Sequence, residues 1–434
     1  MRTGLARAVL STRALAFAAV AACGGTSTHT SETGLQHGDD ASTGPFVEAA
    51  HAPLPQVVFH GGPMLTTPKI VTVTFPGEAN ADALEAFGDT ITTTDWWAAA
   101  TSSLCNDTGN CIGQGTSGGH VRLTSPPAAS YSDATGGGTS TLQVYIAGLV
   151  QSGLLPAPDA NTLYVFYFPA SSLITLTESN TQIVSSCNQF QAYHNTFESQ
   201  TMSAVAYAIV QECAPAAGLT PLQALTFQAS HEIVEASSDP AQQTLGYYLD
   251  LTDTSVLGWD LVIGGELADL CVDVSGLHQD RTAADGYTLQ RIWSNANAAR
   301  GIDPCIPSLA PDVYFNVAPT SSYFVLRVGG QTTFELDAFS TAATDPWTVE
   351  AIDWATEQGM VKAPLLNFSF NGASTATVTN GDKVAVTVSL NADPGQLRGA
   401  EGVFFSVAGS LTAPTAAHIW PILVVTPDVA GGGS

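Results

Sequence analysis

The stretch Thr220–Pro240, TPLQALTFQASHEIVEASSDP, predicts a single helix with both of its ends marked. Thr220 is a suitable N-cap, Pro221 fits the first helical position, and Gln223 completes a capping box. Pro240 ends the helix, because proline disfavours helical geometry in the residue before it. One side of this helix is apolar and carries Leu222, Leu225, Ala229, Ile233 and Ala236.

The other side of the predicted helix carries His231, Glu232 and Glu235. His231 and Glu235 are four residues apart, so their side chains share one face one turn apart. One interpretation is an ordinary solvated polar face. The other is a metal site related to the H-E-x-x-H of zinc peptidases, with Glu235 in place of the second histidine and Glu232 as general base. Zinc is the favoured ion, and because a carboxylate is a harder ligand than imidazole, manganese or calcium are the less favoured alternatives.

A third ligand is expected from the stretch Gly258–Cys271, GWDLVIGGELADLC. Glu266 and Asp269 would share a helix face there, and the sequence leaves open which of the two binds the metal. His194, in AYHNTF, is a candidate accessory ligand from a neighbouring loop, whereas an ordinary hydrogen-bonded loop histidine is the alternative.

The rest of the chain predicts an α/β domain followed by an all-β domain. The runs 69–75, 162–168 and 204–210 are apolar and β-branched, as in strands, and the runs 81–91 and 140–155 have helical spacing. Beyond residue 309, short alternating runs are broken by Gly, Asn and Pro. We therefore expect a zincin-like mixed sheet with helices over residues 56–308, a β-sandwich over residues 309–428, and a disordered tail at 429–434.

The N-terminus predicts export and a lipid anchor. Residues 1–22 combine arginines with an apolar run, as in a signal peptide, and Val20-Ala21-Ala22-Cys23 resembles the bacterial lipobox, in which the cysteine is lipidated. Residues 23–55 are polar and glycine-rich, which predicts a flexible tether. The expected location is the cell envelope, at the outer membrane or the extracellular face, with membrane contact through the anchor only.

Charge and cysteines agree with this location. The chain has 12 Lys and Arg against 38 Asp and Glu, a formal net charge of −26, which excludes nucleic acid as a favoured partner. Six cysteines remain besides Cys23, and an even number in an exported protein indicates disulfides. Many pairings are open to six cysteines, and the simplest joins sequence neighbours: Cys105–Cys111, Cys187–Cys213 and Cys271–Cys305.

Several segments, taken in order, resemble bacterial relatives of the plant Exordium, or phosphate-induced, protein family. They are VVFHGGPMLTTPKIVTVTF, CNQFQAYHNTF, SHEIVEASSDP, GWDLVIGGELADLC and RIWSNANAA. The resemblance covers roughly residues 56–305. The resemblance implies an extracellular module with a gluzincin-like metallopeptidase motif. In gluzincins the third ligand is the Glu of an E-x-x-x-D arrangement, whose Asp supports the first histidine; this chain has E-x-x-D, one residue shorter.

Two functions follow as hypotheses. The first is a secreted, lipid-anchored, zinc-dependent hydrolase, with a peptidase acting on a peptide or cell-wall substrate as the favoured kind. The second is a non-catalytic envelope lipoprotein that binds cell wall or glycan and keeps the acidic cluster for structure or for calcium.

Overall fold

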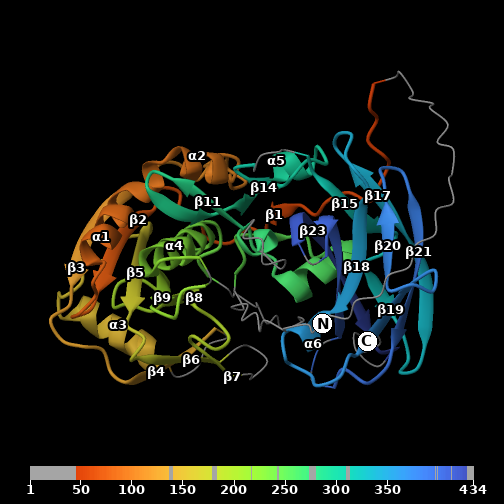
Figure 1. The fold of residues 1–434 in the computed structure, drawn as a ribbon. Helices are drawn as coiled ribbons and strands as arrows, with labels where there is room; N and C mark the ends of the chain where they lie inside the picture. The colour runs from red at the N-terminus through yellow and green to blue at the C-terminus, as the bar shows by residue number, and fades with distance from the viewer. Residues whose placement is uncertain are drawn as a thin grey trace.

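The computed structural model describes residues 45–427, apart from 136–139, 178–182, 217, 242–243, 273–279, 309–312, 396, 398 and 412. The predicted signal peptide, Cys23, the tether up to residue 44 and the tail 429–434 lie outside the described residues. Figure 1 shows a mixed α/β region on the left and a β-rich region on the right.

A five-stranded mixed sheet forms the centre of the α/β region. Its order is β3-β2-β5-β9-β8, in which β8 pairs antiparallel with β9 at one edge and the other neighbours are parallel. The strands are β2 (Lys69–Thr74), β3 (Thr116–Arg122), β5 (Thr162–Phe168), β8 (Ala192–Phe197) and β9 (Val205–Gln211). Every residue of β5 and β9 is buried, as their continuous apolar sequences predict for central strands.

Helices cover both faces of this sheet (Figure 1). Alternate residues of β5 divide between two cores: Leu163 and Val165 face the core that contains α1 and α4, whereas Tyr164 and Phe166 face the core that contains α3. The helices are α1 (Ala81–Thr90), α2 (Asp95–Thr101), α3 (Thr141–Gln151) and α4 (Pro221–Ser238), with a 3-10 turn, η1 (Ile91–Thr93), between the first two. A small sheet beside α3 has the order β4-β6-β7 and consists of β4 (Ser130–Ala134), β6 (Leu173–Thr177) and β7 (Ile183–Ser185).

Short elements connect the two regions. Three two-stranded sheets pair β1 with β10, β11 with β12, and β13 with β14. The elements are β1 (Val57–Phe59), β10 (Tyr247–Leu249), η2 (Thr254–Val256), the π-helix η3 (Trp259–Ile263), η4 (Asp269–Cys271), β11 (Arg281–Ala284), β12 (Tyr287–Gln290), β13 (Ile292–Trp293), α5 (Asn295–Ala298) and β14 (Cys305–Ile306).

The C-terminal region consists of two sheets that pack against each other through aromatic side chains such as Phe334 and Phe404, whose ring centroids are 6.0 Å apart. One sheet has the order β15-β17-β21-β19 and the other β16-β23-β22-β18-β20; all neighbours are antiparallel except β16 and β23. The elements are β15 (Phe315–Pro319), β16 (Tyr323–Val325), β17 (Gln331–Ser340), β18 (Trp347–Asp353), α6 (Trp354–Glu357), β19 (Leu366–Phe370), β20 (Thr375–Val378), β21 (Lys383–Leu390), β22 (Ala400–Ser410) and β23 (Ala413–Val425).

The two regions share one hydrophobic core, which runs from α4 through the connecting elements into the C-terminal sheets. Trp259 of η3 packs on Trp420 of β23, with 5.6 Å between ring centroids. A Cβ on Gly258 would lie 2.7 Å from the carbonyl oxygen of Pro421, so the chains approach too closely there for a side chain. The boundary expected near residue 309 is therefore not a break in the core.

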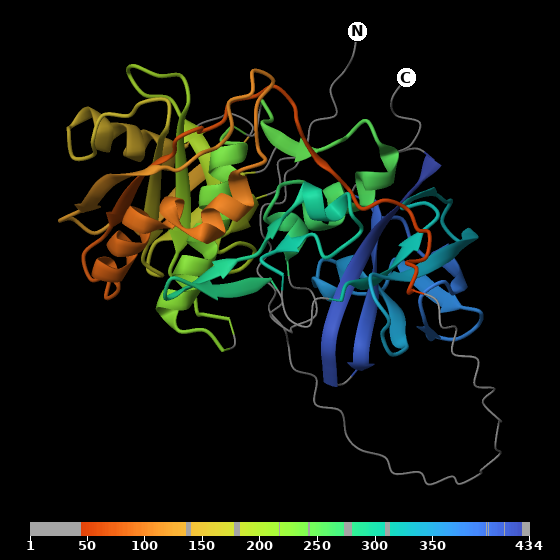
Figure 2. The same ribbon diagram turned by 90° about the horizontal axis from the view of Figure 1, so that it is seen from above.

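Part of the predicted tether belongs to the fold. Residues 45–55 lie along the β-rich region, as the red segment in Figure 2 shows. The backbone amide of Ala49 donates to Asn380 over 3.0 Å, and the ring of His51 stacks on Phe339 with 3.5 Å between centroids. Composition predicted a tether over residues 23–55 as a whole because residues 24–44 are polar and glycine-rich. Residues 45–55 are more apolar, and Leu54 among them is buried in the core.

Three disulfides join Cys105 to Cys111, Cys187 to Cys213 and Cys271 to Cys305, which are the sequence neighbours that the simplest prediction paired. They indicate an extracellular or envelope location, since disulfides persist in oxidising compartments. Within the described residues, no helix is both long and apolar enough to cross a membrane.

His418 gives the fold a measurable pH dependence. Its half-buried ring lies on β23 against Tyr314 and Phe315, and burial lowers its pKa from 6.5 to about 4. The folded state thus prefers the neutral ring, so this contribution to stability is complete above pH 6.5 and is lost as the pH falls towards 4. Urea unfolding at a series of pH values should show that the wild-type protein loses about 1–3 kcal/mol more than His418→Gln across this range. Parallel pH profiles for the two proteins would contradict this assignment.

A candidate metal centre on helix α4

Helix α4 begins and ends as the sequence predicts. The Thr220 hydroxyl accepts from the amide of Gln223, and the Gln223 side chain accepts from the amide of Thr220, so both bonds of the capping box form. The helix ends at Ser238, and the amide of Asp239 bonds the carbonyl of Glu235. Every residue from Ala224 to Ser238 is buried except Gln228.

The polar side of α4 is not solvated. His231, Glu232 and Glu235 are each 0% exposed, because this side packs against His194 of β8, Gln290 of β12 and the turn before η4. The interpretation of a solvated helix face is therefore excluded. A buried histidine and two buried carboxylates require partners, since unpaired buried charge is costly.

Gln290 at the end of β12 fixes the orientation of His231. The amide nitrogen of Gln290 donates to the carbonyl of Ala268 over 2.8 Å, which turns its oxygen towards Nδ1 of His231 at 3.0 Å. An oxygen only accepts, so Nδ1 of His231 carries the proton and a neutral ring presents a lone pair at Nε2. Histidines that bind metals are oriented in the same way by a hydrogen bond at the second nitrogen.

The lone pair of His231 faces a carboxylate. Nε2 lies 2.9 Å from Oε2 of Glu235, yet neither atom makes a hydrogen bond there. The other oxygen of Glu235 accepts from the amides of Ala268 and Asp269, each over 3.1 Å, which holds the carboxylate in place. Two acceptor atoms this close require a shared cation, either a proton or a metal ion.

Asp269 completes the first triad. Its Oδ1 lies 3.6 Å from Nε2 of His231, and the three ligand atoms of His231, Glu235 and Asp269 lie within 4.8 Å of one another. Ligands in a tetrahedral zinc site are about 3.3 Å apart, given bonds of about 2.0–2.1 Å. The triad therefore has the spacing that a metal ion needs.

The turn before Asp269 brings two glycines close to the side chains of Asp269 and Tyr248. Gly264 has φ +113°, and a Cβ there would lie 2.1 Å from the Asp269 carboxylate; a Cβ on Gly265 would lie equally close to the Tyr248 ring. The expectation that Glu266 and Asp269 share a helix face was wrong. Glu266 lies in the turn and Asp269 begins η4, so the two carboxylates join different groups.

Glu266 belongs to a second triad, with His194 and Glu235, whose ligand atoms also lie within 4.8 Å of one another. His194 lies on the edge strand β8 and not on a loop, and it is completely buried. Its Nε2 lies 3.0 Å from the carbonyl of Asp239 and 3.5 Å from Oε1 of Glu266. Its Nδ1 lies 3.2 Å from Glu232 and 3.9 Å from Glu235.

Burial and mutual repulsion perturb the pKa values of this cluster. Burial, followed by repulsion from Glu235, Asp239 and Asp269, raises the pKa of Glu266 well above its usual value, and burial also raises the pKa of Glu232. Burial opposes ionisation of Glu235 as well, but the attraction of His231 outweighs it and lowers the pKa. Burial opposes protonation of His231, whereas Glu235 and Glu232 raise its pKa to about 10. Without a metal ion, protons therefore bind at the positions that a cation would take.

Two contributors gave no signal in the sequence. Gln290 and the carbonyl of Asp239 orient the two histidines, but a glutamine at a strand end and a backbone carbonyl match no motif. His194 was a candidate from the sequence, but its position on a strand was not predicted, because β8 is short and is preceded by polar residues.

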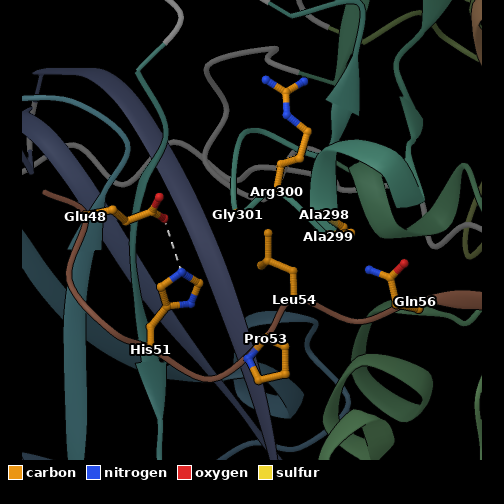
Figure 3. A pocket seen from close by; sticks show the side chains of 9 residues that line it. All are labelled: Glu48, His51, Pro53, Leu54, Gln56, Ala298, Ala299, Arg300 and Gly301. Atoms are coloured by element: carbon orange, nitrogen blue, oxygen red, sulfur yellow. Dashed lines mark hydrogen bonds and ion pairs between the residues drawn. The ribbon is translucent and has the colours of Figure 1, made fainter.

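A pocket of about 520 Å³ lies elsewhere, between residues 48–56 and α5 (Figure 3). Glu48, His51 and Arg300 are its charged or titratable side chains, and none of the cluster residues lines it. The metal-ligand candidates are therefore inside the fold and not in this open pocket.

Comparisons with known proteins do not identify a family. No family model matches the chain, and no curated protein matches it. Among solved structures, it is similar to domains 5–6 of the S-layer protein SbsC, with 16% identity over 26% of this chain and 45% of that chain, at a TM-score of 0.18. It is also similar to domain 1 of VCBP3 from Branchiostoma floridae, with 10% identity over 28% of this chain and 98% of that chain, at the same TM-score of 0.18. The chain spans less than half of the S-layer structure, and similarities this low carry no argument about function.

The turn geometry predicts the effect of a methyl group on Gly264. Gly264→Ala should lower the free energy of unfolding by more than Gly77→Ala, in which strain at φ +95° costs about 1 kcal/mol and no atom lies within 4 Å of the new Cβ. The difference arises because only the methyl at Gly264 meets the Asp269 carboxylate. Chemical denaturation of both variants measures it, and equal losses would show that Asp269 moves aside at no cost.

Proposed function

We propose that the protein is an extracellular or envelope zinc-dependent hydrolase, and specifically a peptidase that acts on peptide or cell-wall substrates. The observation that carries the proposal is the lone pair of His231, fixed by Gln290 and facing the Glu235 carboxylate at 2.9 Å. His231, Glu235 and Asp269 would hold the ion, with zinc favoured over manganese or calcium for a site that includes a histidine.

Glu232 has the position of a general base. Its Oε1 makes no hydrogen bond and lies 4.0 Å from Nε2 of His231, while its Oε2 is held by His194. When bound, zinc supplies a Lewis acid that polarises a substrate carbonyl and lowers the pKa of water. Oε1 of Glu232 would take a proton from the attacking water and pass it to the leaving amine.

The surrounding fold supports a zincin-like arrangement. The motif helix α4 packs beneath a mixed sheet, beside the antiparallel edge strand β8. The C-terminal sheets would then form a β-sandwich that serves as a spacer or binding module.

Complete burial favours a second candidate, the non-catalytic envelope lipoprotein that binds cell wall or glycan. A catalytic zinc keeps one position open to substrate, whereas a structural zinc has a closed set of ligands. Here His194, His231 and their four acidic neighbours are at most 1% exposed. In this candidate the ion stabilises the packing of α4 against β8 and the turn before η4.

Two substitutions separate binding from chemistry. Glu235→Ala should abolish binding of stoichiometric zinc, because Glu235 belongs to both triads. Glu232→Gln should keep the zinc and lower peptidase activity by at least about 100-fold, since a base contributes roughly 10²–10⁴-fold. Elemental analysis and hydrolysis of a peptide library measure the two effects.

Glu85→Ala serves as the control, because it removes a buried carboxylate of α1 outside the centre and should keep both zinc and activity. If the wild-type protein binds zinc but hydrolyses no peptide, and Glu232→Gln binds the same amount of zinc, the non-catalytic envelope lipoprotein replaces the hydrolase. Wild-type protein that takes up no metal would refute the hydrolase and leave the non-catalytic envelope lipoprotein, which then keeps the acidic cluster for structure alone.

We also propose that the mature protein is anchored through a lipid on Cys23, at the outer membrane or the extracellular face. Support comes from Val20-Ala21-Ala22-Cys23 after an arginine-bearing apolar segment. Cys23→Ala should leave the precursor uncleaved or release the protein from the membrane fraction. Unchanged processing and fractionation would exclude the anchor.

A further inference from the structure

We propose that the centre on α4 holds two divalent cations that share carboxylate ligands, an inference that rests on the proposed metal centre. The first position lies among His231, Glu235 and Asp269, and the second among His194, Glu235 and Glu266. Five of the six side chains around α4 form two triads that have Glu235 in common, so their ligand atoms do not converge on one point; Glu232 belongs to neither triad.

His194 supports the second position by proton counting. Its Nε2 faces the Asp239 carbonyl and Glu266, and its Nδ1 faces Glu232 and Glu235. A neutral imidazole has one proton for two nitrogens, so one nitrogen presents a lone pair to carboxylate oxygens. With the proton on Nδ1, the lone pair of Nε2 faces Glu266. With the proton on Nε2, the lone pair of Nδ1 faces Glu235, so a member of the second triad faces the lone pair in either tautomer.

Two carboxylates lie between the two histidines. Oε2 of Glu235 is 2.9 Å from Nε2 of His231 and 3.9 Å from Nδ1 of His194, and it makes no hydrogen bond. Glu232 spans the same gap, with Oε1 4.0 Å from His231 and Oε2 3.2 Å from His194. The Glu235 carboxylate can bridge two ions from this place, while Asp269 and Glu266 each serve one and Glu232 stays beside them as the general base.

Formal charge is balanced by a second ion, which would replace protons that otherwise neutralise the cluster. Glu232, Glu235, Glu266 and Asp269 carry −4 together when ionised, and each is at most 1% exposed. One divalent cation leaves this buried set at −2, whereas two bring it to zero. Burying uncompensated charge is costly, so the neutral arrangement is the stable one.

Glu266 supplies a further observation at the second position. Its Oε2 is buried and makes no hydrogen bond, although its neighbours Glu235 and Asp269 carry the same charge. A single ion at the first triad would leave this buried oxygen with neither a hydrogen bond nor a cation. Two histidines with four carboxylates are also the ligand set of the di-iron and di-manganese carboxylate proteins, which use it on helical bundles.

Counting ions in the purified mature protein loaded with Zn²⁺, and separately with Mn²⁺, tests the proposal. Native mass spectrometry should show two ions per chain, and anomalous diffraction should show two peaks about 3.5–4 Å apart. His194→Ala and Glu266→Gln should each reduce the count to one, and Asp269→Asn should also leave one. Glu235→Ala should leave none, and Glu85→Ala should keep two.

The outcomes separate this inference from the metal centre itself. One ion in the wild-type protein that His194→Ala leaves in place would overturn the two-ion centre and keep the proposed single-ion function. One ion that is lost from both His194→Ala and Asp269→Asn would mean a single shared position, and it would overturn the proposal too. A wild-type protein that binds no ion would overturn the two-ion centre and the proposed metal centre together. The near-isosteric Glu266→Gln and the diffraction measurement on wild-type protein keep the test decisive if His194→Ala does not fold.

Discussion

The burial of four carboxylates beside two histidines is the constraint on which the rest of this structure depends. Glu232, Glu235, Glu266 and Asp269 lie inside the protein, where each charge has lost its contact with water. The effective penalty is several kcal/mol per ion, and it is offset only by cations and hydrogen bonds in good geometry. Glu235 has partners at both carboxylate oxygens. Two backbone amides donate to one oxygen, and Nε2 of His231 lies 2.9 Å from the other.

The fold brings these groups together from three distant segments. Helix α4 supplies the motif, β8 supplies His194, and the turn before η4 and the first residue of η4 supply Glu266 and Asp269. Cys187–Cys213 connects the segment before β8 to the segment after β9, and Cys271–Cys305 ties the end of η4 to β14. These links reduce the freedom of the segments that carry the like charges, so repulsion is resisted by covalent bonds as well as by packing.

The sequence could predict elements with local signals. Capping residues and Pro240 mark α4, and continuous apolar runs mark β5 and β9, because these patterns act within a few residues. Helical spacing also showed that His231 and Glu235 would share a face. It could not show that this face is buried, since burial depends on β8 and β12 packing over it. Nor could it separate Glu266 from Asp269, because the positive φ of Gly264 turns the chain between α4 and η4 in a way that no periodicity records.

Glutamate at position 235, where a zinc peptidase has its second histidine, has a chemical consequence. The Nε2 of an imidazole has one lone pair and binds one ion, whereas a carboxylate oxygen can contact two. The Oε2 of Glu235 lies between His231 and His194 and is the atom that both triads have in common. A histidine there would leave His194 and Glu266 without a common ligand and would remove one of the negative charges that a second cation balances. The glutamate therefore converts a motif for one ion into a ligand that two neighbouring ions share. Asp269 completes the first position and Glu266 the second.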